Sequence, residues 1–421
     1  MPDAPAPPDA ASPASRVARP AALVVLGGFV CQLALGYGHT YGHVLNDITA
    51  ELGWTRAEFS FVRVPQMIMM SVASPIAGIA LARLGARPIL VGSVACLLAS
   101  QWILSEMGSL AAFGTAAALQ GLVAVGLGDV VVGAIVARWV TRARGLALGL
   151  VFAGSNVAGY LLATALPRLA AAHGWRAAVL QVGVVGAALM LPFALFVLRM
   201  PRGDEPGAHE VDPRPAAAPA PGPAVPAARA DLALADALRT RSFWILAWAL
   251  GAFFFVFVGV LDHLVASLRD GGLPRTEASA ALGLAVGVGL VAKPVFGAIA
   301  DGIDARVALR VQFALLAIGT AGLLALPSPW LGPPVLVAFG AATAARDVSY
   351  PLAIEHCFGP RHLAEIYGAL MFLLWAGAVG TLVAGHLYDA HGDYRAAFAL
   401  FAALAVSSFA ATLFVRDERG R

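Results

Sequence analysis

The sequence predicts an all-α membrane protein, with twelve transmembrane helices arranged as two pseudo-symmetric six-helix bundles. Three observations support this prediction. The 421 residues are 59% hydrophobic and only 13% charged, whereas soluble domains carry about 25% charged residues. Apolar runs of about 20 residues, the length that crosses a bilayer, recur along the chain. The second half of the chain also repeats the spacing of small and charged residues found in the first half.

Twelve apolar runs have the length of a transmembrane helix. They lack the alternation of barrel strands, so helices are the structure that satisfies their backbone polar groups in lipid. The first run follows a Pro/Ala-rich tail and continues without a clear cleavage site, so we interpret it as an uncleaved helix. The predicted spans are 20–44, 58–82, 87–105, 109–138, 145–167, 175–199, 242–266, 277–300, 306–326, 333–357, 364–388 and 395–415.

A polar, Pro/Ala-rich stretch at 200–241 interrupts the helices and predicts a disordered linker. It separates a bundle at 20–199 from a bundle at 242–415, and short tails occupy 1–19 and 416–421. Lys and Arg concentrate in alternate loops, in the linker and in both tails, which places these segments in the cytoplasm. We therefore expect a multi-pass protein of the cell (inner) membrane with both termini cytoplasmic.

Several function classes are excluded by composition and motifs. The net charge of +3 is too small to indicate a nucleic-acid partner. Neither the cysteines nor the group Glu355, His356, His362 and Glu365 has the spacing of a metal site. Nucleotide-binding and catalytic motifs are absent, which predicts no enzyme and no cofactor, and favours secondary transport. We expect a monomer in the lipid bilayer that carries a small molecule.

Residues recur at one constant interval between the two halves. Several independent matches at the same interval indicate parallel six-helix repeats, an architecture in which substrate binds near the midplane between the halves. The matched pairs are Gly53 and Gly272, Arg56 and Arg275, Glu58 and Glu277, Ser60 and Ser279, Pro75 and Pro294, Gly78 and Gly297, Gly149 and Gly368, and Arg176 and Arg395.

A charged motif follows the second span, at 78–87, and it resembles the G-x-x-x-D-R-x-G-R signature of the major facilitator superfamily. Ala82 occupies the acidic position and Arg83 the basic one. The second copy keeps the acid as Asp301 but lacks the following arginine. Together, this motif and the internal repeat make nearly the whole chain, 20–415, resemble a major facilitator transporter. The resemblance implies alternating access, with Arg83 and Asp301 as gating or structural charges.

Two further segments, Arg138 to Gly154 and His263 to Gly272, resemble signature sequences of the monocarboxylate transporter and oxalate/formate antiporter group. The acidic-glycine-aromatic pattern of the first helix in monocarboxylate carriers is absent here. The resemblance implies a small organic anion as substrate, most simply a monocarboxylate, moved by proton symport or by anion exchange. In this group a cationic residue just before the proline of the eighth helix binds the substrate anion, and Lys293 matches that position.

Lys293 is the only lysine among 28 Lys and Arg residues, and it lies inside the eighth predicted span. Its counterpart in the repeat is Ser74, whereas the neighbouring proline and glycine recur, so the scaffold does not require the lysine. A charge at the centre of a membrane helix costs about 2.5–3.5 kcal/mol. Three interpretations stay open: contact with the substrate anion, a structural ion pair, or snorkelling to the interface.

Other charges within the spans have both functional and structural interpretations. Arg346 lies near the middle of the tenth span and is followed by Asp347. It is either a second clamp on a carboxylate, which suits the guanidinium fork, or a structural partner of Asp347. Arg63, near the start of the second span, pairs with a residue such as Asp47, lies at the membrane interface, or takes part in gating or substrate steering.

Candidates for proton coupling lie in two places. Asp129, in the inner part of the fourth span, is expected to pair with a cytoplasmic arginine such as Arg138 or Arg142, or to carry a coupling proton. Asp262 and His263 close the seventh span on the outer side, and histidine titrates near physiological pH. Their alternative role is interface hydrogen bonding.

An aromatic and histidine cluster, Tyr37, His39, Tyr41 and His43, ends the first predicted span. The two histidines are four residues apart and would share one helical face. We expect these residues either to line the substrate cavity or to anchor the helix at the membrane interface.

The sequence therefore predicts a secondary active transporter of a small organic anion that works by alternating access. An alternative is a proton-coupled exporter of drugs or another metabolite. A different class is a non-transporting membrane sensor on the same scaffold.

Overall fold

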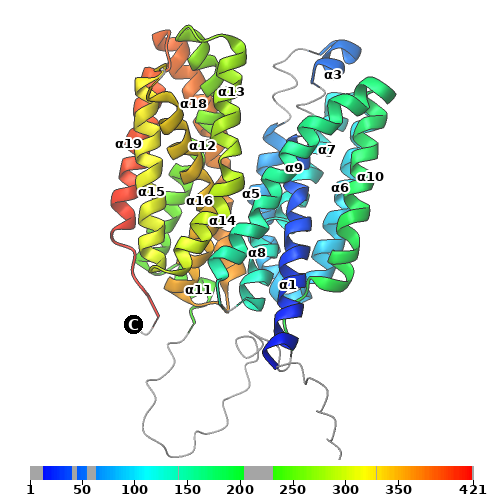
Figure 1. Ribbon diagram of the computed structural model, residues 1–421, viewed down its shortest axis with the longest axis vertical. Helices are drawn as coiled ribbons and strands as arrows, with labels where there is room; N and C mark the ends of the chain where they lie inside the picture. Colours follow the sequence, from blue (N-terminus) through cyan, green and yellow to red (C-terminus); the bar gives the residue numbers. More distant parts are fainter. Residues whose placement is uncertain are drawn as a thin grey trace, which may run out of the picture.

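The computed structural model describes residues 13–39, 45–54, 63–140, 142–202, 231–328 and 330–419, which are almost entirely helical. The helices stand side by side in two groups, shown in Figure 1. The first bundle contains α1 (Pro13–Gln32), η1 (Leu33–His39), α3 (Leu45–Leu52), α5 (Arg63–Leu84), α6 (Ala86–Glu106), α7 (Leu110–Gly126), α8 (Asp129–Trp139), α9 (Arg144–His173), α10 (Trp175–Pro192) and η2 (Phe193–Val197).

The second bundle has the same arrangement, and its first short helix falls within the predicted linker at 200–241, so this linker is helical in part. It contains α11 (Leu234–Ala237), α12 (Arg241–Asp270), α13 (Arg275–Gly287), α14 (Gly289–Asp301), α15 (Ala305–Gly322), η4 (Leu323–Ala325), α16 (Gly332–Phe358), α17 (Leu363–Met371), η5 (Phe372–Trp375), α18 (Ala376–His391) and α19 (Arg395–Thr412).

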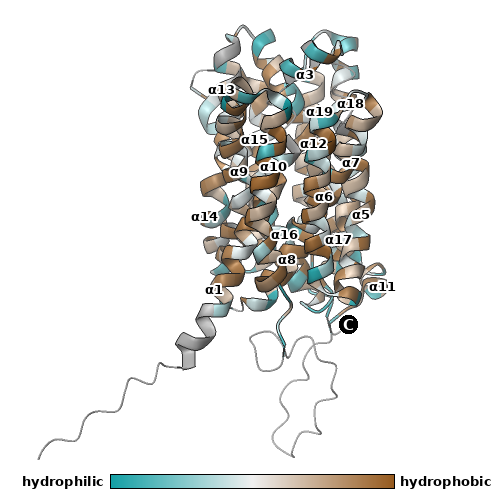
Figure 2. Ribbon diagram, turned by 90° about the vertical axis from the view of Figure 1, so that its right-hand side faces the viewer, coloured by the Kyte–Doolittle hydropathy of each residue, from teal (hydrophilic) through white to brown (hydrophobic). Residues whose placement is uncertain are grey.

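In the described part of the chain, 11 helices are long and apolar enough to cross a membrane. The helix α16, 27 residues long, stands among them and carries the charged pair Arg346 and Asp347. Figure 2 shows a hydrophobic belt around the middle of the molecule with hydrophilic residues at its two ends, as a bilayer requires. The predicted all-α fold of two six-helix bundles is confirmed.

Helix ends differ from the prediction in two places that matter for the site. The first α-helix ends at Gln32, and the chain continues as a 3₁₀ helix to His39. The fourth span consists of two helices, because Gly128 adopts an extended backbone between α7 and α8. The sequence did not reveal this break, because glycine is also frequent in continuous membrane helices.

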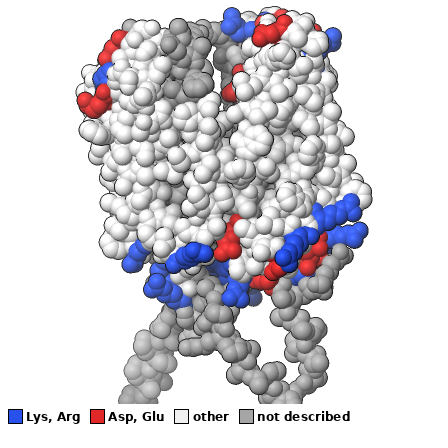
Figure 3. All heavy atoms as spheres, turned by 180° about the vertical axis from the view of Figure 1, so that it is seen from behind, with Lys and Arg blue, Asp and Glu red and all other residues white. Residues whose placement is uncertain are grey.

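Charges mark one end of the molecule. We call this the linker end, because α11, which lies within the predicted linker at 200–241, is found there with the C-terminus; the opposite end, near α3, is the far end. Figure 3 shows Lys and Arg gathered at the linker end and the surface hollowed between the bundles at the far end. Asp304 caps α15 at the linker end, and its hydrogen bond from the Arg306 side chain lowers the pKa of this carboxyl well below its usual range.

The bundles touch near the linker end through two symmetric sets of small residues. A side chain on Gly149 of α9 would overlap the backbone of Lys293 on α14, and one on Gly368 of α17 would overlap the backbone of Ser74 on α5. These are the repeat partners of one another, so the two interfaces are built alike. Only glycine permits helices to approach this closely.

A carboxylate reinforces one of these interfaces. Asp301, at the end of α14, accepts hydrogen bonds from the backbone nitrogens of Gly145 (2.6 Å) and Leu146 (2.9 Å), the first turn of α9 in the other bundle. The positive end of the α9 dipole favours this position for a negative charge. At the equivalent interface, where α5 meets the start of α17, the matching residue is Ala82 and the cap is missing.

We expect Asp301→Ala to open the linker end, because it removes a helix cap that typically contributes about 1 kcal/mol. The population with separated linker ends should rise about fivefold, which spin-label distances between α9 and α14 would measure. The matched variant Ala82→Asp supplies the missing cap to α17 and should shift the population the other way. Equal distance distributions in both variants and the wild type would show that the cap does not hold the bundles together.

Candidate functional site

Four charged side chains form one buried cluster where the bundles meet. Asp129 lies at the start of α8, Lys293 in α14, and Arg346 and Asp347 in α16, and each is at most 9% exposed. Asp347 links the two cations, with one carboxylate oxygen 2.8 Å from Lys293 Nζ and the other 2.6 Å from Arg346 Nη2. Arg346 Nη1 in turn lies 3.5 Å from Asp129 Oδ2. Two carboxylates and two cations therefore balance in charge.

Lys293 uses all three of its donors on protein acceptors. Besides Asp347, its ammonium donates to the Phe152 carbonyl and to Ser155 Oγ, each at 2.9 Å, and both acceptors belong to α9 of the other bundle. The side chain is 7% exposed, so the snorkelling interpretation is wrong. The interpretation as a structural ion pair agrees with the contact to Asp347, and contact of Lys293 with a substrate anion stays a prediction.

Arg346 is less completely satisfied. Its Nη1 donates to the Tyr367 hydroxyl at 2.9 Å, and the rings of Phe253 and Phe254 face its guanidinium at 5.5 and 5.3 Å. Its Nε is buried and has no hydrogen-bond partner in the described part of the chain. A buried guanidinium donor without an acceptor is costly, so this is the atom of the cluster best placed to receive an acceptor from a ligand. The expected pair with Asp347 is present, and Arg346 retains donor capacity beyond it.

Asp129 does not pair with either predicted arginine. Its Oδ1 accepts a hydrogen bond from Gln32 Nε2 of α1 at 3.1 Å, and Oδ2 faces Arg346. Arg138 lies at the other end of α8, where its Nη2 donates to the Arg361 carbonyl at 2.7 Å. The expected pairing is wrong because Arg138 lies about two and a half helical turns from Asp129, whereas Arg346 reaches Asp129 from the opposite bundle.

Comparison with known proteins identifies the scaffold that holds this cluster. Residues 24–376 match the Major Facilitator Superfamily. The chain belongs to this family. Human monocarboxylate transporter 11 is 28% identical over 405 residues, covering 89% of this chain and 78% of the relative. The protein is therefore a membrane transporter and not an enzyme.

Solved structures confirm the fold of this facilitator. A proton:xylose symporter superposes with a TM-score of 0.72 at 14% identity, covering 96% of this chain and 98% of that one. The E. coli fucose:proton symporter gives a TM-score of 0.68 at 13% identity, with 94% and 99% of the two chains covered. At such low identity these likenesses show the shared architecture alone.

Of the aromatic and histidine cluster at the end of the first span, the structure describes the side chain of Tyr37. Tyr37 is buried inside the first bundle of the facilitator, and its hydroxyl donates to the Val182 carbonyl at 2.8 Å. The backbone from Leu33 to His39 is a 3₁₀ helix, and the relation between His39 and His43 stays a prediction. The side chain of His39, and Tyr41 and His43 altogether, lie outside the described residues.

Asp262 and His263 lie toward the far end and hold α12 against neighbouring segments. His263 Nε2 is 3.1 Å from the Thr381 carbonyl and its Nδ1 is 3.1 Å from the Tyr394 hydroxyl, so a neutral imidazole satisfies both contacts. The Thr381 hydroxyl donates to Asp262 at 2.8 Å. These contacts agree with the alternative of structural hydrogen bonding, and they lie apart from the central cluster.

The remaining predicted charges fall outside the cluster. Asp47 is exposed on α3, and the side chain of Arg63 is outside the described residues, so their pairing stays a prediction. Arg83 is exposed at the end of α5 and forms no ion pair with a described residue. In the described ranges no group of His, Cys, Asp and Glu residues could hold a metal ion.

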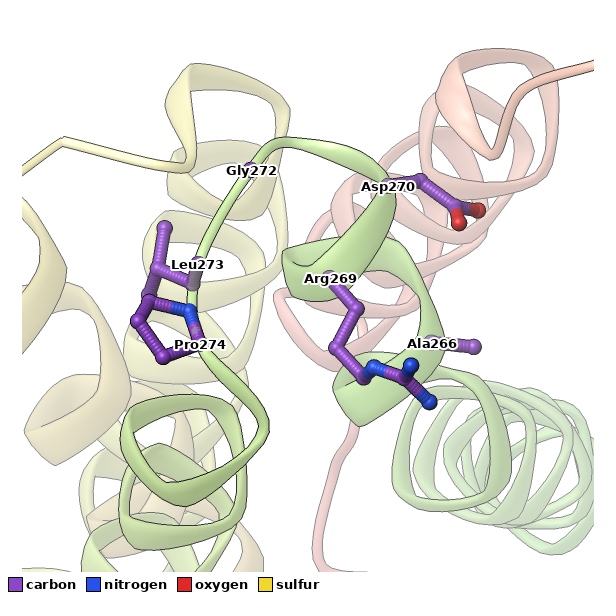
Figure 4. A pocket seen from close by; sticks show the side chains of 6 residues that line it. All are labelled: Ala266, Arg269, Asp270, Gly272, Leu273 and Pro274. Atoms are coloured by element: carbon purple, nitrogen blue, oxygen red, sulfur yellow. The ribbon is translucent and has the colours of Figure 1, made fainter.

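A surface pocket lies at the far end, between the end of α12 and the start of α13. Figure 4 shows that the side chains of Arg269 and Asp270 in it point in different directions, with Gly272, Leu273 and Pro274 forming the opposite wall. None of the central charged residues lines it. Its residues from Ala266 to Gly272 belong to the segment that resembles the carboxylate-carrier signature, but the pocket adds no donor to the central site.

Sequence reasoning missed the neutral partners in the cluster, namely Gln32, Ser155 and Tyr367. A signal for them was present in the repeat. Their counterparts at the constant interval are Gly251, Leu374 and Leu148, all apolar. A polar residue in a membrane helix whose repeat partner is apolar is not needed by the scaffold, which is the argument that singled out Lys293.

Proposed function

We propose that this facilitator moves a small organic anion, most simply a monocarboxylate, across the cell membrane by alternating access. The observation that supports this most strongly is the buried Nε of Arg346, a cationic donor without an acceptor at the junction of the two bundles. A carboxylate suits this donor because a hydrogen bond between a guanidinium and a carboxylate is charge-assisted and therefore strong. The printed name of the human relative, monocarboxylate transporter 11, supports the same substrate class.

In this proposal the two cations have different tasks. Arg346 binds the substrate carboxylate directly, and the faces of Phe253 and Phe254 beside it accommodate a short apolar chain. Lys293 holds Asp347 in place and fastens α14 to α9 of the other bundle. Lys293 therefore has partners before the substrate binds, and it would exchange these contacts when the bundles move.

The direction of opening follows from the distribution of arginines. We assign the linker end to the cytoplasm, because Lys and Arg gather there and positive charge favours the cytoplasmic side. Both tails and the linker, at 200–241, then lie in the cytoplasm. The glycine interfaces and the Asp301 cap close the cytoplasmic side in this conformation, so the site faces the outside.

Charge balance favours proton symport over exchange. The cluster is neutral as it stands, so an added anion would leave a net negative charge in a site of low dielectric constant. One proton per monocarboxylate restores neutrality. Exchange of one anion for another would require the charged, loaded cluster to be stable in both conformations.

The proposal is tested by uptake of radiolabelled lactate, pyruvate, acetate and oxalate into proteoliposomes, with and without an inward-directed pH gradient. We expect uptake of a monocarboxylate that is stimulated by external acid. Lys293→Ala should slow transport by about tenfold or more, through the maximal rate rather than the KM, because it frees Asp347 and unfastens α14. Lys293→Arg, which keeps the charge, should lose less.

Two results would contradict the proposal. If none of the carboxylates is transported, the proposed organic-anion substrate is wrong, and export of another metabolite or a sensor role is favoured. A wild-type rate in the Lys293→Ala protein would show that the cluster takes no part in transport.

A further inference from the structure

We propose that Asp129 is the proton-binding residue of this transporter, and that its carboxylate holds the place beside Arg346 which the substrate carboxylate takes over. This inference rests on the proposed function, since it names the residue through which an organic anion and a proton are coupled. It begins from the unequal surroundings of the two buried carboxylates.

Asp347 is the better compensated of the two. Each of its oxygens contacts a cation, at 2.6 Å for Arg346 and 2.8 Å for Lys293. Asp129 has one cationic contact, at 3.5 Å, and its other oxygen accepts from the neutral amide of Gln32. A buried carboxylate with fewer positive contacts loses less on protonation. Asp129 therefore accepts a proton before Asp347 does.

The groups facing Asp129 come from four helices. Arg346 and Asp347 face it from α16, Lys293 from α14, Gln32 from α1 and Tyr367 from α17. These comprise two cations, one carboxylate and two neutral groups. Protonation of Asp129 therefore leaves the cluster with a single positive charge, and a monocarboxylate removes it.

The break in the fourth span places a second attraction for an anion at the same point. Asp129 is the first residue of α8, an 11-residue helix whose preceding residue Gly128 is extended. The backbone nitrogens of the first helical turn have no acceptor within the helix. Arg346, nine-tenths buried and with its Nε unpartnered, approaches this turn from the other bundle. One negative charge is favoured there, and Asp129 supplies it when no substrate is bound.

A substrate carboxylate at Arg346 would bring two negative charges together. Their repulsion is relieved when a proton from the outer solution binds an oxygen of Asp129, after which the substrate alone carries the negative charge beside Arg346. When the substrate leaves on the other side, Asp129 gives the proton up and pairs with Arg346 again. Proton binding and substrate binding thus favour each other, which is the requirement for symport.

The first test needs no substrate. In an infrared titration of the purified full chain, the carbonyl band of the first protonated carboxylic acid to appear as pH falls should be missing in Asp129→Asn. It should persist in Asp262→Asn, which removes the carboxylate nearer the far end. A band that persists in Asp129→Asn and disappears in another acidic variant would overturn the assignment, whether or not a carboxylate is transported.

The second test separates coupling from binding. With lactate as the probe, a gradient of one pH unit should give the wild type about tenfold accumulation at one proton per anion. Asp129→Asn should exchange internal for external lactate but lose accumulation, because asparagine carries no proton. Asp262→Asn should accumulate lactate like the wild type. Accumulation by Asp129→Asn at the wild-type level would overturn the inference while leaving the proposed substrate in place.

Discussion

Arg346→Lys is expected to remove most carboxylate uptake, although the charge is kept. A lysine can still pair with Asp347, but it cannot also supply the Nε donor that we assign to the substrate. Loss of the charge-assisted hydrogen bond from Nε, about 1.5–3 kcal/mol, should raise the KM by about tenfold or more. Initial rates of lactate uptake at increasing concentrations would measure this change.

The matched control is Arg310→Lys. Arg310 donates to the backbone carbonyls of Thr412 and Leu413 at the linker end and has no contact with the cluster. This variant should retain the wild-type KM. If Arg346→Lys also retains the wild-type KM, the guanidinium does not bind the substrate, and Lys293 becomes the candidate for substrate binding.

The fold could be predicted from the sequence because its causes are local. Apolar runs of bilayer length specify helices one at a time, and the repeat of Pro75 and Gly78 in Pro294 and Gly297 shows that two halves share one scaffold. The interface glycines then occupy equivalent places in the structure, as the repeat implies. What the hydropathy pattern could not predict is the break at Gly128, because an interrupted and a continuous helix are equally apolar.

The site was predicted residue by residue but not as a cluster. Lys293, Arg346 and Asp129 each stood out as charges in apolar runs, yet their partners depend on how the two bundles meet. Charge pairing along the chain suggested Arg138 for Asp129, and packing between bundles placed Arg346 there instead. The repeat also indicates that the scaffold does not require these charges, since the counterparts of Arg346, Asp347 and Asp129 are the uncharged residues Leu127, Gly128 and Val348.

Asp347→Asn is expected to have the largest effect on stability. Among the described residues, Asp347 alone forms ion pairs with both cations of the cluster, so its loss leaves Lys293 and Arg346 buried together with one carboxylate, Asp129, which lies 3.5 Å from Arg346. Breaking a buried ion pair in this way costs about 3–5 kcal/mol. The melting temperature of the purified protein should fall markedly, and transport should be lost.

A double variant separates stability from function. Asp347→Asn combined with Lys293→Met removes one charge of each sign and leaves the neutral pair of Asp129 and Arg346. Replacing a whole buried ion pair is often neutral for stability, so the melting temperature should recover while transport does not. A double variant that is as unstable as Asp347→Asn alone would show that the pair serves the fold. A double variant that is stable but inactive would show that the ion pair of Lys293 and Asp347 serves transport. The bundles exchange contacts during transport, and an uncharged pair could not form the alternative contacts.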